Sequence, residues 1–229
     1  MSRSDELAAN LDALEQRVAA ACAATGRARD EVAVVAVSKT WPESDVALLR
    51  DLGVGDFGEN RDAEAARKAA EVPDVRWHFV GTVQTNKANS ISAYADVVHS
   101  LDRTALVDAL SKGAVRAGRV IDVLVQVDLD ETPHRGGVRP DDAIALADLA
   151  AAAAGLRLAG VMAIAPLGSD PAPAFNRLAV VAQEVRRSHP DATILSAGMS
   201  ADLEAAVAAG ANLLRVGTAL FGTRPPLSR

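Results

Sequence analysis

Lys39 is the residue whose position is most suggestive of chemistry. It follows Val32–Val37, an unbroken apolar run that predicts a strand buried on both faces. A lysine at the end of such a strand should have a partly desolvated ammonium. Desolvation favours the free amine, a nucleophile that forms Schiff bases with carbonyl compounds. The competing interpretation is a lysine that extends into water or pairs with Glu59.

Small and hydroxyl-bearing residues follow the last two apolar runs of the chain, at Gly198–Ser200 and at Gly217 and Thr218. Small residues let backbone N–H groups approach phosphate oxygens, and a helix that begins at Ser200 would favour an anion. An ordinary N-cap serine and turn glycines would give the same pattern. Together with a strand-end lysine, these segments suggest a phosphorylated aldehyde or ketone as the ligand.

Arg215 lies near the end of the last apolar run and should face the same end of the fold as the lysine. A pyridoxal phosphate site needs a lysine for the aldehyde, a phosphate cup and a partner for the pyridine nitrogen, which can be arginine. Arginine does not give up its proton, so it would leave that nitrogen unprotonated and the cofactor a weak electron sink. Arg215 could instead pair with a carboxylate or itself hold phosphate.

The scaffold that brings these residues together is predicted from an alternation of strand-like and helix-like segments. Eight βα units predict a single α/β domain over residues 1–229, a (β/α)8 TIM barrel whose strand ends carry the active site. An open doubly wound sheet is the alternative, but no Gly-rich dinucleotide motif follows the first strand. The strands are predicted at Val32–Val37, Val54–Phe57, Trp77–Val80, Asp96–His99, Val123–Val127, Leu158–Ile164, Thr193–Leu195 and Leu213–Val216. The helices between them are predicted at Glu43–Leu52, Asp62–Glu71, Gln84–Tyr94, Arg103–Gly118, Asp141–Gly155, Ala174–Ser188 and Ser200–Gly210.

An extra helix is predicted ahead of the barrel, within residues 1–30. Its apolar stripe consists of Leu7, Leu11, Leu14 and Val18. Ser4 is the candidate N-cap, and the helix should stop at Gly26. We expect the stripe to pack on the barrel rather than on a partner, which favours a monomer.

Composition excludes several function classes. The net charge of -6 argues against nucleic acid, because phosphate backbones require a basic face. One cysteine and four scattered histidines argue against a disulfide framework or a metal site. The chain shows neither a charge-free run of transmembrane length nor an apolar signal-peptide core near its start, so we expect no membrane association and a cytoplasmic location.

The motifs together resemble those of the pyridoxal phosphate homeostasis proteins, whose fold is like the barrel domain of alanine racemase (fold type III). The matching segments occur in order over nearly the whole chain. They are AVSKTWP (36–42), DFGEN (56–60), WHFVGTVQTNK (77–87), VHSLDR (98–103), VLVQVDLDE (123–131), LAGVMAIAP (158–166), SAGMSADLEAAVAAGA (196–211) and LRVGTALFGTR (214–224).

The resemblance implies cofactor-binding roles for eight residues. Lys39 would carry pyridoxal phosphate as a Schiff base, and Arg215 would face the pyridine nitrogen. Further residues implied around the ring are Asn60, His78 and Met162, and those implied around the phosphate are Ser200, Gly217 and Thr218.

The function implied by the resemblance is homeostasis of pyridoxal phosphate, with supply of the cofactor to apo-enzymes and without robust catalysis. Alanine racemase uses a lysine and a tyrosine as its two bases, whereas the one tyrosine here, Tyr94, is predicted in the helix after the third strand, and no second domain is predicted. An amino-acid racemase and a Schiff-base aldolase acting on a sugar phosphate are the alternatives.

The chain departs from the pattern of many family members at three places. They are Thr82 in place of proline, Ala197 in place of leucine, and His134 and Arg135 where a loop lysine often precedes glycine. We therefore assign no function to a lysine in that loop.

Overall fold

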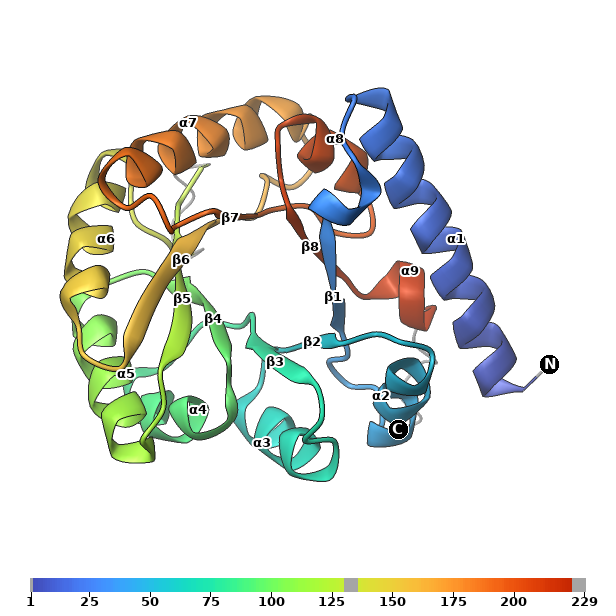
Figure 1. The fold of residues 1–229 in the computed structure, drawn as a ribbon, viewed down its shortest axis with the longest axis horizontal. Helices are drawn as coiled ribbons and strands as arrows, with labels where there is room; N and C mark the ends of the chain where they lie inside the picture. The colour runs from blue at the N-terminus through green and yellow to red at the C-terminus, as the bar shows by residue number, and fades with distance from the viewer. Residues whose placement is uncertain (1, 130–135, 224–229) are drawn as a thin grey trace.

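The computed structural model describes residues 2–129 and 136–223. Eight parallel strands form a closed barrel in sequential order, surrounded by helices, as Figure 1 shows along the barrel axis. This confirms the predicted (β/α)8 fold over the open sheet. The strands are β1 (Ala33–Val37), β2 (Asp56–Glu59), β3 (Arg76–Phe79), β4 (Val97–Leu101), β5 (Ile121–Gln126), β6 (Leu156–Met162), β7 (Ile194–Ser196) and β8 (Leu213–Val216). His134 and Arg135 lie outside the described residues.

The helices follow the predicted order with shifted ends. They are α1 (Arg3–Ala24), α2 (Glu43–Asp51), α3 (Asp62–Glu71), α4 (Ala88–Tyr94), α5 (Thr104–Ala117), α6 (Ala143–Ala152), α7 (Ala172–Ser188), α8 (Leu203–Ala208) and α9 (Thr218–Phe221). Short 3-10 turns are η1 (Arg29–Glu31), η2 (Thr85–Lys87) and η3 (Pro140–Asp142). The single turn α9 was not predicted, because four residues are too few to show a helical period.

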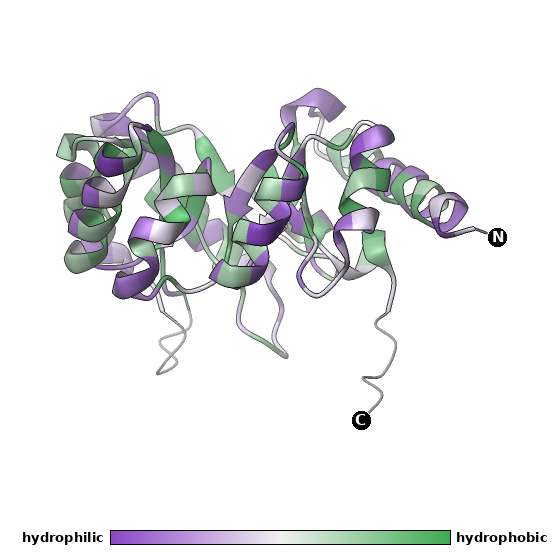
Figure 2. Ribbon diagram, turned by 90° about the horizontal axis from the view of Figure 1, so that it is seen from below, coloured by the Kyte–Doolittle hydropathy of each residue, from purple (hydrophilic) through white to green (hydrophobic). Residues whose placement is uncertain are grey.

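The main hydrophobic core lies between the barrel and the helices around it. Outward-facing strand residues such as Phe57, Val123 and Leu214 are completely buried against the helices. All six residues of β5 are buried, as expected for a parallel strand covered on both faces. The helices carry both hydrophobic and hydrophilic residues, which suits one face on the sheet and one in water (Figure 2).

The N-cap of the leading helix α1 lies two residues earlier than predicted. Ser2, not Ser4, is the N-cap: the Ser2 hydroxyl accepts from the Asp5 amide at 3.1 Å, and the Asp5 carboxylate accepts from the Ser2 amide at 2.8 Å. This reciprocal box satisfies two amides at once, which an isolated cap at Ser4 would not do. Three of the four predicted stripe residues, Leu7, Leu14 and Val18, are buried, so the stripe packs on the barrel as expected.

Two features relevant to function class are absent from the described part of the chain. None of its helices is long and apolar enough to cross a membrane. No cluster of three or more histidine, cysteine or acidic side chains in residues 2–129 and 136–223 has the arrangement of a metal site.

Candidate functional site

Lys39 lies in the turn that follows β1, at the end of the barrel where the strands terminate. Its side chain is exposed, so the expectation of partial desolvation is wrong. The alternative pairing with Glu59 is also wrong, because that carboxylate is bound by Lys68. Within the described residues, the Lys39 amine has no hydrogen-bond or ion-pair partner and is accessible to a ligand.

A buried lysine supports this turn from behind. Lys68 on α3 is completely buried, and its ammonium donates to the Ser38 carbonyl at 2.8 Å, to Glu59 at 2.5 Å and to Glu64 at 2.8 Å. The Ser38 hydroxyl donates to the same Glu59 oxygen at 2.6 Å. Glu64 also accepts from the Thr40 amide at 2.6 Å. The residues on both sides of Lys39 are therefore tied to one charged cluster, which we call the Lys68 cluster.

The backbone held by the Lys68 cluster is strained. Thr40 has a φ of 69°, which is unusual for a β-branched residue. Burial raises the pKa of Glu59 against the opposing effect of Lys68, and its second oxygen has no hydrogen-bond partner in the described chain. Such strain persists only where the surroundings over-determine it, and functional sites often contain it. Sequence reasoning missed Lys68, although a lysine four residues after Glu64 on an alanine-rich helix face was the available signal.

The predicted phosphate residues meet where β7 and β8 end. The Ser200 hydroxyl accepts from the Ala219 amide at 3.1 Å, which joins the two loops. The amides of Ser200, Gly217 and Thr218 donate to no residue among those described. Several amides without partners at one place form a cup suited to phosphate oxygens.

The approach to this cup depends on glycine. Gly198 has a φ of 89°, and a side-chain carbon there would lie 2.6 Å from the Ala206 methyl group. The predicted helix start at Ser200 is wrong, since α8 begins at Leu203. The Asp202 carboxylate accepts from the Met199 amide at 2.6 Å and closes a turn, so the residues from Met199 to Asp202 form this turn and not the first turn of the helix. The Ser200 amide is therefore a loop amide, whereas Gly217 and Thr218 supply amides at the start of the short helix α9.

Arg215 is 5% exposed and points into the barrel from β8. It donates to the Ser196 hydroxyl at 2.7 Å and to the Ala163 carbonyl at 2.8 Å. No carboxylate of residues 2–129 or 136–223 lies within ion-pair distance, so the alternative of a carboxylate partner is wrong. Burial lowers the pKa of Arg215 to about 10. Two of its five N–H donors are used by these contacts, which leaves three for a ligand.

Of the three remaining predicted residues, two lie on strands and one directly follows a strand. Asn60 follows β2, and its side-chain amide makes no hydrogen bond within the described residues. Met162 ends β6 in register with Ser196 and is buried inside the barrel. His78 on β3 is also buried, but both its ring nitrogens are already bonded, so its role around a cofactor ring stays a prediction.

The one tyrosine is held in place on α4. The Tyr94 hydroxyl donates to Asp62 at 3.4 Å, and burial together with that carboxylate raises the tyrosine's pKa. Tyr94 therefore stays protonated at neutral pH and is a poor general base.

These residues fit a phosphorylated aldehyde that also carries a hydrogen-bond acceptor. Lys39 offers an accessible amino group without a partner among the described residues. The amides beyond β7 and β8 offer a phosphate cup, and Arg215 offers buried donors. The strands that supply them, β7, β8 and β1, are adjacent in the closed barrel. Pyridoxal phosphate has all three complementary groups.

Comparison with known proteins gives consistent results. Residues 9–225 match the sequence model of the family described as alanine racemase, N-terminal domain. The pyridoxal phosphate homeostasis protein of Mycobacterium tuberculosis is 41% identical over 243 residues, which cover 97% of this chain and 94% of that protein.

Solved structures show the same similarity. PipY of Synechococcus elongatus, in a structure with pyridoxal phosphate bound, matches with a TM-score of 0.77 and 34% identity, covering 90% of this chain and 100% of that chain. Alanine racemase from Corynebacterium glutamicum matches with a TM-score of 0.74 and 16% identity, covering 99% of this chain and 62% of that chain, which is a likeness of fold.

Proposed function

The chain belongs to the alanine racemase N-terminal domain family and, within it, to the pyridoxal phosphate homeostasis proteins, and we propose that it binds pyridoxal phosphate and supplies it to apo-enzymes. The observation that carries this proposal is Arg215, a buried cation with three N–H donors left, close to amides that have no partner among the described residues. Burying a charge this way is costly unless a ligand completes its bonding.

Seven of the eight predicted residues have a task in this proposal. Pyridoxal phosphate carries an aldehyde, and Lys39 is the residue whose amino group would hold it covalently, with loss of water. Ser200, Gly217 and Thr218 bind the phosphate, and Arg215 donates to the pyridine nitrogen. Asn60, which follows β2, and Met162, which ends β6, would complete the ring pocket. Because a Schiff base is hydrolysed or exchanged with other amines, an exposed Lys39 suits release of the cofactor as well as its capture.

We favour a carrier over a racemase for two reasons. Arginine beside the ring nitrogen leaves that nitrogen unprotonated, so a carbanion would be poorly stabilised. Tyr94 is bonded to Asp62 and its pKa is raised, so a second base is not supplied from α4. Incubation with L-alanine in deuterated water, followed by proton NMR, should show no exchange of the α-proton above the rate for free cofactor.

The proposal extends to the setting in which the protein acts. We propose that the protein acts in the cytoplasm. We also propose that it is a monomer, because the apolar stripe of α1 packs on its own barrel. Size-exclusion chromatography with light scattering should give a mass close to 23.7 kDa.

The deciding experiment is a visible absorption spectrum after addition of pyridoxal phosphate to the wild type, Lys39→Ala and Lys87→Ala. Lys87 is an exposed lysine on the loop after β3 and serves as the matched control. We expect a band that borohydride abolishes in the wild type and in Lys87→Ala, and no such band in Lys39→Ala. A wild type without a band refutes the cofactor, whereas a band that persists in Lys39→Ala assigns the attachment to another lysine.

A further inference from the structure

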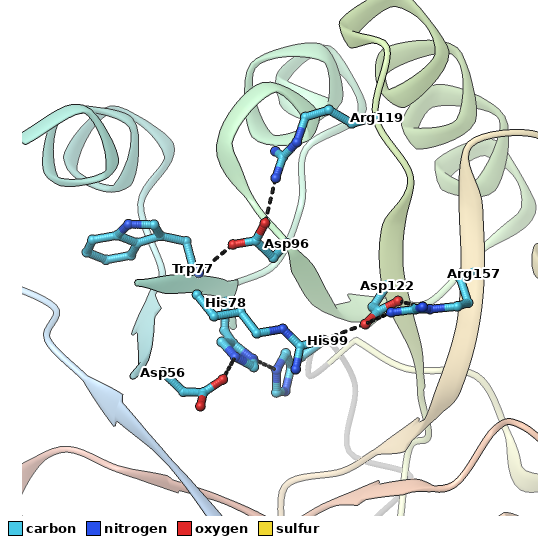
Figure 3. A network of polar contacts seen from close by, with 9 residues as sticks. Asp56, Trp77, His78, Asp96, His99, Arg119, Asp122 and Arg157 are labelled. Carbon is cyan, nitrogen blue, oxygen red and sulfur yellow. Dashed lines mark hydrogen bonds and ion pairs between the residues drawn. The ribbon is translucent and has the colours of Figure 1, made fainter. Parts of the chain in front are cut away.

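A chain of hydrogen bonds runs through the inside of the barrel and ends at Arg215. Starting from β2, Asp56 is 2.7 Å from His78 Nε2, and His78 Nδ1 is 2.9 Å from His99 Nε2, as Figure 3 shows. His99 Nδ1 is 3.1 Å from the Ser196 hydroxyl, which is 2.7 Å from Arg215. We call these residues the Asp56–Arg215 relay.

With both imidazoles neutral, the carboxylate end of the relay fixes the direction of every hydrogen bond in it. An arginine can only donate, and an ionised carboxylate can only accept. Arg215 therefore donates to Ser196, whose hydroxyl donates to His99 Nδ1. His99 Nε2–H then donates to His78 Nδ1, and His78 Nε2–H donates to Asp56. All four bonds can form at once with both imidazoles neutral and each in one tautomer.

Burial keeps the two histidines in that neutral state. Desolvation lowers the pKa of both His78 and His99. The positive charges of Arg215 and Arg76 lower the pKa of His99 further. The carboxylate of Asp56 acts in the opposite direction on His78 without outweighing burial.

Other charged groups near the start of the relay are engaged elsewhere. Asp96 pairs with Arg119 at 2.6 Å, and Asp122 pairs with Arg157 at 2.5 Å (Figure 3). Asp122 also pairs with Arg76 at 2.5 Å. Asp56, whose side chain is 31% exposed, accepts a hydrogen bond from the neutral His78.

The relay therefore determines where the buried guanidinium points. The Ala163 carbonyl can only accept, whereas the Ser196 hydroxyl can rotate, and giving its proton to His99 holds its lone pairs toward Arg215. The negative charge that the relay connects to Arg215 is Asp56, four hydrogen bonds away. Charge-assisted, directed hydrogen bonds of this kind fix orientation as well as energy.

We propose that Asp56, His78, His99 and Ser196 are positioning residues that hold Arg215 as a donor aimed at the ring nitrogen of the cofactor. This rests on the proposed function, since it requires pyridoxal phosphate at the end of the barrel. None of the four needs to touch the cofactor. Their effect is confined to the strength of the bond between Arg215 and the ring nitrogen.

The test compares two ligands that differ at one atom. Dissociation constants are measured for pyridoxal phosphate and for its analogue with C–H in place of the ring nitrogen, using absorbance and equilibrium dialysis. We expect the wild type to prefer pyridoxal phosphate. In Ser196→Ala the preference should fall about tenfold, because Arg215 loses one of its two anchors. In Asp56→Asn it should also fall, because an amide no longer fixes the direction of the relay.

The matched control is Asp148→Asn. Asp148 also accepts from a histidine, His189, at 2.7 Å, but on the outer helices, so the ligand preference should stay as in the wild type. A general loss of stability would weaken both ligands equally and leave their ratio unchanged. Thermal unfolding of each variant identifies such a loss.

Each outcome decides one point. A wild type that binds neither ligand refutes the proposed function itself. A wild type that binds both equally, or an unchanged preference in Ser196→Ala, overturns the positioning role while leaving the cofactor in place. A fall in Ser196→Ala without a fall in Asp56→Asn overturns the relay beyond the serine.

Discussion

Replacing Lys68 by methionine tests whether the Lys68 cluster holds the turn that carries Lys39. Methionine keeps most of the length and apolar bulk of lysine but removes the ammonium. Three acceptors lose their donor: the Ser38 carbonyl, Glu59 and Glu64. The Ser38 carbonyl and Glu59 are buried, so water does not readily replace the lost bonds.

The expected loss of stability in Lys68→Met is large because the buried carboxylate of Glu59 is left without its charged partner. Breaking a buried ion pair on one side costs about 3–5 kcal/mol of unfolding free energy. Burial already raises the pKa of Glu59, and removal of Lys68 raises it further. A raised carboxyl pKa means that the folded state binds a proton that the unfolded state has released, so stability falls as pH rises. The loss in Lys68→Met should therefore be greater at about pH 8 than at about pH 5.

Urea unfolding followed by circular dichroism measures this loss directly. Lys112→Met is the matched control, since Lys112 on α5 is exposed, and its cost should stay below about 0.5 kcal/mol. The double variant Lys68→Met with Glu59→Gln removes both charges and should recover about half of the loss or more. A loss below about 1 kcal/mol in Lys68→Met, or one independent of pH, would refute the reasoning.

Three further predictions concern the loops and the relay. Gly198→Ala should cost about 3 kcal/mol in urea unfolding, because its φ is 89° and the added carbon would lie 2.6 Å from the Ala206 methyl group. Ser200→Ala should raise the dissociation constant of pyridoxal phosphate about tenfold in an absorbance titration, since the hydroxyl that accepts from Ala219 is lost. The pKa of His99 is lowered in the folded state, so the unfolded state binds more protons and stability falls as pH drops below about 6.5. In His99→Gln, the free energy of unfolding should fall by about 1 kcal/mol less than in the wild type between about pH 7 and about pH 5.5, as measured by urea unfolding at both pH values.

The order of the strands was predictable from the sequence because each carries an apolar run, yet some ends were not. The second strand was predicted at Val54–Phe57 and lies at Asp56–Glu59. Gly58 and Glu59 do not look like strand residues, and packing explains both. A side-chain carbon on Gly58 would lie 3.0 Å from the Val35 side chain, so glycine fits the crowded interior. Glu59 is in the strand because Lys68 pairs with it.

The candidate site was predictable where the strand ends alone define it. Lys39, Ser200, Arg215 and Gly217 follow or end strands, so strand prediction located them. The relay was not predictable, because His99 and Ser196 are 97 residues apart and meet through closure of the barrel. Sequence spacing gives no signal for such a contact.

The two buried cations of this barrel differ in a way that separates structural support from ligand binding. Lys68 has three N–H donors and three acceptors around it, so its bonding is complete within the protein. Arg215 has five donors and contacts two neutral acceptors in the described chain, although it is nearly as deeply buried. Burial without completed bonding costs free energy unless something else supplies the acceptors. Arg215, whose donors are not all used, is therefore the cation expected to bind a ligand. Lys68, whose donors are all used, keeps the turn that carries Lys39 in place while the ligand is exchanged.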